Sequence, residues 1–231
     1  MYEPLKIDVI IPAYNEQAAI GNVIRDIPAH LVRDIIVCNN GSTDQTAQIA
    51  SEAGATVIDV PVRGYGNACL QGIAYIDSKT VKPDVLIFID GDYSDFPEEI
   101  PLLIEPIRSK RAHLVIGSRS LGNAQSGSMT PQQIFGNWLA TRLIRIFFSV
   151  TFTDLGPFRA ITYEALEQLK MKDRNYGWTV EMQVKAAKLN ISFEEVAVSY
   201  RVRIGKSKVS GTVKGTVMAG YKIMWTILKY I

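Results

Sequence analysis

A chain of 231 residues can bury a substantial core as one large domain, or as one domain with an appendage. Its hydrophobic content of 47% and charged content of 21% are ordinary for a soluble globular protein, and a net charge of only +2 argues against nucleic-acid binding. Two cysteines without a short pairing motif exclude a disulfide framework and a zinc-binding pattern. No apolar run approaches the roughly 20 residues that cross a bilayer, and residues 1–6 lack the build of a signal peptide. We therefore expect a cytoplasmic protein.

Strands and helices alternate along the first half of the chain. Apolar runs predict strands at residues 7–11, 34–38, 55–60, 85–89 and 114–116. Apolar residues at helical spacing predict helices near 20–27, through 47–50, and at 67–76 and 97–107. Asn15 is expected to cap the first helix, and Ser42, Thr43 or Asp44 the second. This alternation is typical of an α/β fold in which a doubly wound, mostly parallel sheet carries helices on both faces.

The pattern changes after Gly117-Ser118-Arg119. Residues 122–128 are rich in Gly, Ser and Asn and predict a loop, and Thr130-Pro131-Gln132-Gln133 resembles a capping box at the start of a helix that reaches 151. Beyond it we expect a short return strand, two helices, an alternating strand and a final helix, at residues 158–161, 162–169, 179–189, 193–202 and 211–231.

The buried strand 85–89 stops at two carboxylates, Asp90 and Asp92, separated by Gly91. Ligands of open α/β sheets bind beyond the carboxyl ends of the strands, so a site is expected here. A hard divalent cation can take one or two carboxylates and complete its shell with water and substrate phosphates. For an isolated Asp-x-Asp, an acidic turn without function is the competing interpretation.

Three earlier strand ends carry small or polar residues suited to a nucleotide. Residues 12–16 (Pro-Ala-Tyr-Asn-Glu) follow the first strand, residues 39–44 (Asn-Asn-Gly-Ser-Thr-Asp) follow the second, and residues 63–68 (Arg-Gly-Tyr-Gly-Asn-Ala) open a helix after the third. Glycines allow close approach of a ligand to the backbone, and a helix N-terminus favours an anion. Each motif alone is weak, but all of them precede the paired carboxylates in one predicted sheet.

Together these motifs resemble the family 2 glycosyltransferases with the GT-A fold, over almost the whole chain. Gly117-Ser118-Arg119, residues 154–159 (Asp-Leu-Gly-Pro-Phe-Arg) and Arg203-x-Gly205-x-Ser207-Lys208 are similar to the branch of polyprenyl-phosphate mannose and glucose synthases. The resemblance implies a nucleotide-sugar donor, Mg²⁺ or Mn²⁺ on Asp90 and Asp92, and inversion at the anomeric carbon. It also implies a single GT-A catalytic domain over 1–231, with a nucleotide-sugar-binding half (1–119), an acceptor-side half (120–210) and a C-terminal helix (211–231).

The residues that the resemblance assigns to the substrates come from most of the motifs above. They are Pro12, Ala13, Tyr14, Glu16, Asn39, Asn40, Gly41, Asp44, Gly64, Gly66, Asn67, Asp90, Gly91, Arg119, Arg159, Trp178, Lys206 and Ser207. Members of the family usually carry Asp-Asp or Asp-Asn before Gly-Ser, where this chain has Asn39-Asn40. An amide both donates and accepts, so it can still read a base edge, and the choice between uracil and guanine stays open.

Four residues are predicted to act on the reaction itself: Asp92, Glu181, Arg203 and Lys208. Arg203, Lys206 and Lys208 can offset the charge of the departing diphosphate, although a solvated strand end is the alternative. Glu181 is the candidate general base for a hydroxyl acceptor, or else a glutamate that stabilises the first turn of a helix. A phosphate acceptor needs no base, and Arg119 and Arg159 would then bind it, unless they are structural.

The acceptor is suggested by the helix at 130–151, which is basic and strongly apolar. Such a helix can lie in a membrane interface, or it can cover the sheet or form a dimer. No acidic residue follows Glu195, which points to an anionic ligand or surface. We predict transfer of a hexose, from a UDP-sugar rather than GDP-mannose, to a polyprenyl phosphate, with peripheral contact on the inner face of the membrane. A hydroxyl acceptor, or a binding subunit without activity, are the alternatives.

Overall fold

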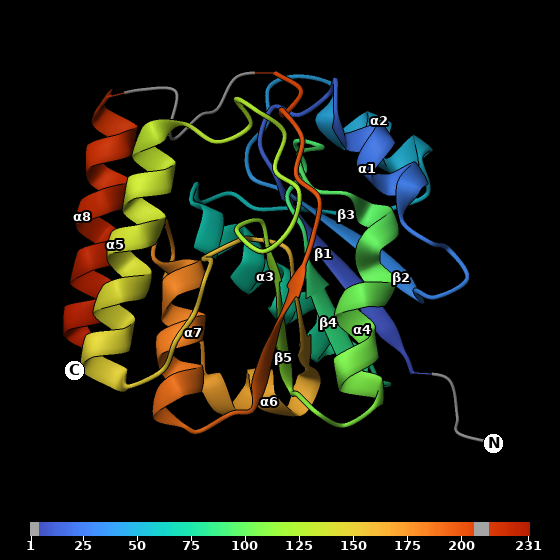
Figure 1. Cartoon of the computed structure of the whole chain (residues 1–231). Coiled ribbons are helices and arrows are strands. Elements are labelled where there is room, and N and C mark those ends of the chain that lie inside the picture. Colours follow the sequence, from blue (N-terminus) through green and yellow to red (C-terminus); the bar gives the residue numbers. More distant parts are fainter. Residues whose placement is uncertain (1–4, 206–212) are drawn as a thin grey trace.

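The computed structural model describes residues 5–205 and 213–231. The strands are β1 (Ile7–Ala13), β2 (Asp34–Asn39), β3 (Thr56–Asp59), β4 (Val85–Phe88), β5 (Leu114–Ser118), β6 (Arg159–Thr162) and β7 (Phe193–Ala197). The helices are α1 (Ile20–Asp26), α2 (Thr46–Glu52), α3 (Tyr65–Ser78), α4 (Ile100–Arg108, after a 3₁₀ turn at Pro97–Glu99), α5 (Pro131–Phe148), α6 (Tyr163–Leu169), α7 (Trp178–Lys188) and α8 (Val213–Lys229). Figure 1 shows their arrangement. The predicted Lys206, Ser207 and Lys208 lie outside the described residues.

One seven-stranded sheet runs through the described part of the chain in the order β3-β2-β1-β4-β6-β5-β7. All seven residues of β1 are buried, as expected for an inner strand covered on both faces. β6 is antiparallel to both β4 and β5, and the other pairs are parallel. The predicted doubly wound, mostly parallel α/β sheet is confirmed. Because β6 runs backwards, its first residue, Arg159, pairs with Phe88 at the carboxyl end of β4.

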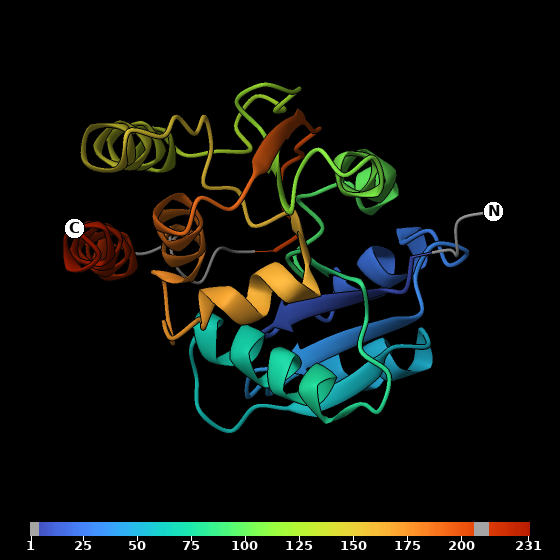
Figure 2. The same ribbon diagram turned by 90° about the horizontal axis from the view of Figure 1, so that it is seen from below.

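Each face of the sheet has its own apolar core. Residues of α1, α2 and α4 fill the core on one face. Residues of α3, α5, α6, α7 and α8 fill the core on the other, and Figure 2 shows α3 next to α6. The carboxyl ends of β1, β2 and β4 therefore open at one edge between two packed layers, where a ligand site is expected.

Helices α5 and α8 lie side by side at one end of the molecule (Figure 1). The predicted capping box is confirmed: Thr130 Oγ1 accepts from the Gln133 N–H, and the Gln133 side chain accepts from the Thr130 N–H. Among the described residues, no helix has the length and hydropathy that a membrane crossing requires.

Some local predictions are wrong. Asn15 does not cap α1, because its backbone has a positive φ of 53° and α1 begins five residues later, at Ile20. The Asn15 side chain instead accepts the Thr43 N–H, which joins the loops after β1 and β2. The strand expected over 193–202 ends at Ala197, and Tyr200 forms only isolated bridges to Asp95 and Ala124. None of the three caps considered for α2 is its N-cap, which is Gln45, although the carboxylate of the preceding Asp44 accepts the N–H of Thr46.

Candidate active site

A cavity of about 350 Å³ opens at the carboxyl ends of β1, β2 and β4. It is lined by Pro12, Ala13, Tyr14, Glu16, Asn40, Arg63, Gly64, Tyr65, Ala68, Asp90, Gly91, Asp92, Tyr176 and Arg203. Ten of these fourteen residues belong to the predicted site. A cavity of similar size lies between α3 and α6. Its lining contains no two acidic residues that are close together in the sequence, as Asp90 and Asp92 are. We therefore take the first cavity as the candidate active site.

Asp90 and Asp92 both line this cavity, and each is oriented by a neighbour. Asp92 Oδ1 accepts hydrogen bonds from the N–H and hydroxyl of Ser94, at 2.9 and 2.5 Å. Asp90 Oδ1 accepts from the Tyr65 hydroxyl at 3.0 Å. Burial, together with the negative charge of Asp92, raises the pKa of Asp90 to about 7. Two crowded carboxylates in one cavity are a donor set that suits a divalent cation, which would relieve their repulsion.

Arg203 is a cation that faces Asp92 and Glu16. Its Nη1 lies 3.1 Å from Asp92 Oδ2, and its Nη2 lies 3.0 Å from Glu16 Oε1. The Ile204 N–H donates to the Asp92 carbonyl, which fastens the segment after β7 to the end of β4. The guanidinium therefore bridges carboxylates from two strand ends, at the place where an anionic ligand would enter.

The two asparagines at the end of β2, Asn39 within the strand and Asn40 directly after it, have different surroundings. The Asn39 amide lies outside the cavity lining, and it donates to Asp59 and accepts from the Ser42 N–H. Asn40 lines the cavity, accepts the Gly64 N–H at 2.8 Å and donates to the Val62 carbonyl at 3.0 Å. Asn40 thus braces the loop that carries Arg63, whose guanidinium lies 4.3 Å from the centre of the Tyr14 ring.

The glycines of residues 63–68 serve the packing of the chain itself. A Cβ at Gly64 would overlap the Arg174 carbonyl, and a Cβ at Gly66 would overlap the Asp173 carbonyl. Close approach was correctly expected here, but the approaching group is this backbone segment rather than a ligand. The Asn67 side chain donates to the Arg63 carbonyl, and neither Gly66 nor Asn67 lines the cavity. Gly41 and Asp44 are likewise outside the lining.

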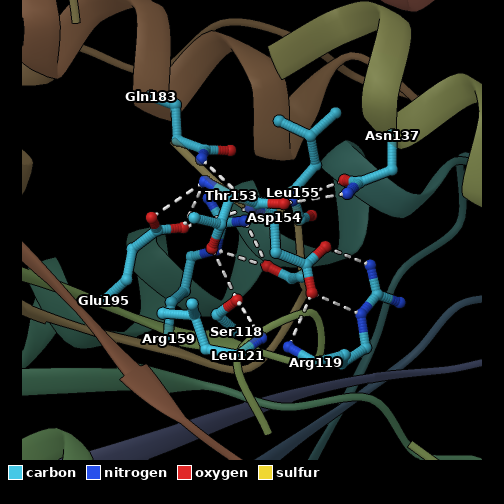
Figure 3. A network of polar contacts seen from close by, with 11 residues as sticks. Ser118, Arg119, Leu121, Asn137, Thr153, Asp154, Leu155, Arg159, Gln183 and Glu195 are labelled. Carbon is cyan, nitrogen blue, oxygen red and sulfur yellow. Dashed lines mark hydrogen bonds and ion pairs between the residues drawn. The ribbon is translucent and has the colours of Figure 1, made fainter. Parts of the chain in front are cut away.

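Arg119 and Arg159 both lie in a polar network around residues 153–159 (Figure 3). Arg119 pairs with the Asp154 carboxylate through Nε and Nη2, at 2.8 and 2.6 Å. Arg159 is fully buried and donates to the carbonyls of Leu155, Gly156 and Thr179. Burial lowers the pKa of Arg159 to about 10, so it stays charged at neutral pH. These contacts favour the alternative that both arginines are structural, because they hold residues 154–159 in place and neither arginine lines the cavity.

Glu181 and Trp178 are also outside the cavity lining. Trp178 packs against Phe88 in the core. Glu181 is 1% exposed and accepts from the N–H groups of Lys172 and Asp173, from Lys185 and from the Tyr230 hydroxyl. Burial raises the pKa of Glu181, but these hydrogen bonds lower it more, and the net pKa is below its ordinary value. A carboxylate held in this way is poorly placed to take a proton from an acceptor.

Four lining residues were not predicted as site residues: Arg63, Tyr65, Ala68 and Tyr176. The first three belong to the motif at 63–68. The position of this motif after a predicted strand could have identified them as site residues. Tyr176 reaches the cavity from a segment more than a hundred residues further along the chain. No spacing in the sequence connects it to the other strand ends.

Comparisons with known proteins agree with this geometry. Residues 8–170 match the family model described as glycosyl transferase family 2. An uncharacterized glycosyltransferase of Mycobacterium tuberculosis is 33% identical over 92% of this chain and 94% of its own. The undecaprenyl-phosphate mannosyltransferase of Micrococcus luteus is 29% identical, over 91% and 90%. The glucosyl-3-phosphoglycerate synthase of M. tuberculosis, solved with Mn²⁺ and UDP-glucose, is 25% identical with a TM-score of 0.75, over 98% and 79%.

The fold is that of the GT-A glycosyltransferases, and the family match shows that the chain is a glycosyltransferase. The chain belongs to glycosyl transferase family 2.

Proposed function

We propose that this enzyme is a metal-dependent, inverting hexosyltransferase that uses a UDP-sugar and transfers the sugar to a polyprenyl phosphate. The observation that carries the proposal is the cavity that holds Asp90, Asp92 and Arg203 together at the carboxyl ends of the strands. A structural neighbour with Mn²⁺ and UDP-glucose supports the donor, and the undecaprenyl-phosphate mannosyltransferase supports the acceptor. In this proposal residues 1–119 bind the donor, 120–210 lie on the acceptor side, and 211–231 complete one catalytic domain.

Asp90 and Asp92 would hold the Mg²⁺ or Mn²⁺ ion. When bound, such a cation acts as a Lewis acid that neutralises charge on the departing nucleoside diphosphate. The Tyr65 hydroxyl orients Asp90, and the two hydrogen bonds from Ser94 fix Asp92. These contacts hold both carboxylates in place before any ligand arrives, so little reorganisation is needed on binding.

Arg203 is proposed to move from the carboxylates of Glu16 and Asp92 to the diphosphate of the donor. A guanidinium matches phosphate oxygens in a bidentate manner, and its charge favours the leaving group. Tyr14 and Arg63 border the part of the cavity beside Asn40, which suits the base and ribose. Lys206, Ser207 and Lys208 remain proposed contacts to the diphosphate, outside the described residues.

A phosphate acceptor is favoured because it needs no general base, and Glu181 lies outside the cavity with its pKa lowered. A soluble acceptor is the second candidate, since the solved neighbours include a synthase with phosphoglyceric acid bound. Release of UDP from a UDP-sugar after addition of a short-chain polyprenyl phosphate, compared with phosphoglyceric acid, separates the two.

A panel of UDP-, GDP-, dTDP- and ADP-sugars tests the donor. With Mn²⁺ present, a UDP-sugar at about a hundred times its Kd should stabilise the fold by about 2.7 kcal/mol and raise the Tm by about 5–10 °C. The same panel with EDTA in place of Mn²⁺ is the control, and there the shift should shrink. A shift with GDP-sugars alone would contradict the proposed base, and no shift with any donor would contradict the proposed function.

The outer surfaces of α5 and α8 suit a membrane interface. Both helices lack acidic residues, and together they expose a set of large apolar side chains: Ile134, Phe135, Trp138, Ile146, Phe147, Met218, Tyr221, Trp225 and Leu228. Arg142, Arg145 and Lys229 supply positive charge on the same two helices. An apolar strip flanked by cations fits a bilayer with anionic lipids, which supports peripheral attachment on the cytoplasmic side.

Binding to lipid vesicles tests this surface. The protein should sediment with vesicles that contain phosphatidylglycerol more than with pure phosphatidylcholine, because the basic residues add electrostatic attraction. Trp138→Glu on α5 should weaken this binding by about tenfold, because it places a charge on the apolar strip. Leu102→Glu on the exposed side of α4 is the matched control. Equal binding by both variants, or a stable dimer without vesicle binding, would contradict the assignment.

A further inference from the structure

The segment 172–177, between α6 and α7, borders the proposed donor cavity. Tyr176 of this segment lines the cavity. The Arg174 carbonyl accepts the Asn67 N–H at 2.9 Å, in the first turn of α3. The backbone of Asp173 and Arg174 packs on Gly64 and Gly66, where no Cβ would fit. The position of this segment therefore sets both the place of Tyr176 and the start of α3.

The segment is held from behind by two buried carboxylates. Glu181 Oε2 accepts the N–H groups of Lys172 and Asp173, at 3.0 and 2.6 Å. The Asp173 carboxylate accepts the N–H groups of Asn175 and Gly177, at 2.7 and 3.2 Å. Four backbone donors of one short loop are thus satisfied by two side chains. Removing Glu181 would leave the partly buried N–H groups of Lys172 and Asp173 without this partner, and removing Asp173 would do the same to Gly177, which is costly.

Side chains of helix α8, and of the residue Tyr230 that follows it, contact these two carboxylates in turn. The Tyr230 hydroxyl donates to Glu181 Oε1 at 2.6 Å, and Lys222 Nζ lies 3.0 Å from Asp173 Oδ2. Thr226 is buried against Gly177, where a Cβ would overlap its Oγ1. Each carboxylate that holds the segment is therefore itself held by a side chain from the C-terminal part of the chain.

We propose that Glu181 is a positioning residue, and that residues 222–230 control donor affinity through it and through Asp173. The contacts form a continuous path from α8, through the two carboxylates and the segment 172–177, to Tyr176 and the start of α3. When Tyr230 or Lys222 releases its carboxylate, the segment loosens and the cavity binds the nucleotide less tightly. The proposal rests on the proposed function only in taking a nucleoside diphosphate as the occupant of this cavity.

Tyr230→Phe tests the path, because it removes only the hydroxyl that contacts Glu181. Calorimetric titration of UDP with Mn²⁺ should show a Kd raised about fivefold. The KM for the donor should rise in parallel, while kcat at saturating donor changes by less than about twofold, because only binding is lost. Tyr163→Phe is the matched control, because it also removes a hydroxyl that donates to a carboxylate, that of Asp77, and it should leave both constants unchanged. A Tm loss without a change in Kd would show a merely structural contact and overturn the proposal.

Two further variants sharpen the result. Glu181→Gln should also raise KM more than it lowers kcat, whereas loss of a general base would lower kcat by about a hundredfold or more. Tyr176→Ala combined with Tyr230→Phe should weaken UDP binding by less than the product of the two single effects, because both act on one segment. Multiplicative effects, or equal Kd values for Tyr230→Phe and Tyr163→Phe, would contradict the inference. A wild-type protein that binds no nucleoside diphosphate would instead contradict the proposed function.

Discussion

Replacement of Asp92 by asparagine is expected to lower turnover about a thousandfold, because the variant loses the charge that faces Arg203 and would hold the cation. The amide oxygen can still accept the N–H and hydroxyl of Ser94, so the turn after β4 should persist. The measurement is the rate of UDP release at saturating donor and Mn²⁺. Circular dichroism and the Tm should stay close to those of the wild type.

Asp77→Asn provides the matched control, since it makes the same change at an exposed position on α3. It should keep turnover within about twofold of the wild type. Retention of more than about a tenth of the activity by Asp92→Asn would contradict the central role of this carboxylate. So would a Mn²⁺-dependent rise in Tm, in the presence of UDP, of the same size in both variants.

Replacement of Asp154 by alanine should destabilise the fold by about 3–5 kcal/mol, because it leaves the Arg119 charge without its buried partner. The side chains of Arg119 and Asp154 are only 11% and 1% exposed, and two guanidinium nitrogens contact the carboxylate (Figure 3). The loss is measured as the change in the free energy of unfolding in urea at neutral pH.

Two comparisons make this result specific. Glu105→Ala breaks an ion pair with Arg111 whose side chains are 58% and 48% exposed, and it should cost far less than Asp154→Ala, because solvent screens exposed charges. A double variant, Arg119→Met with Asp154→Leu, should be less destabilised than Asp154→Ala, because no unpaired charge stays buried. Equal losses for the buried and the exposed pair would show that Asp154 is not needed to neutralise Arg119.

The sequence alone determined the features that arise from neighbouring residues. Apolar runs that end in small or polar residues identified the strands, and they placed Asp90 and Asp92 at the end of a buried one. Because parallel strands end at one edge of a sheet, the sequence alone assigns residues 12–16, 39–44 and 63–68 to one region. The capping box at Thr130 is equally local, since donor and acceptor are three residues apart.

Only the tertiary structure decided which charged side chains face the cavity and which are paired with other residues inside the protein. Arg119 meets Asp154, 35 residues away, and Glu181 meets Tyr230, 49 residues away. A short motif carries no information on such partners, since a free arginine and a paired one look the same in the sequence. Arg203 reaches Glu16 across 187 residues, and it remains in the cavity because β7 ends beside β5 and the chain then returns to β4. The sequence thus shows which residues are charged, whereas long-range packing decides which of these charges are available to a ligand.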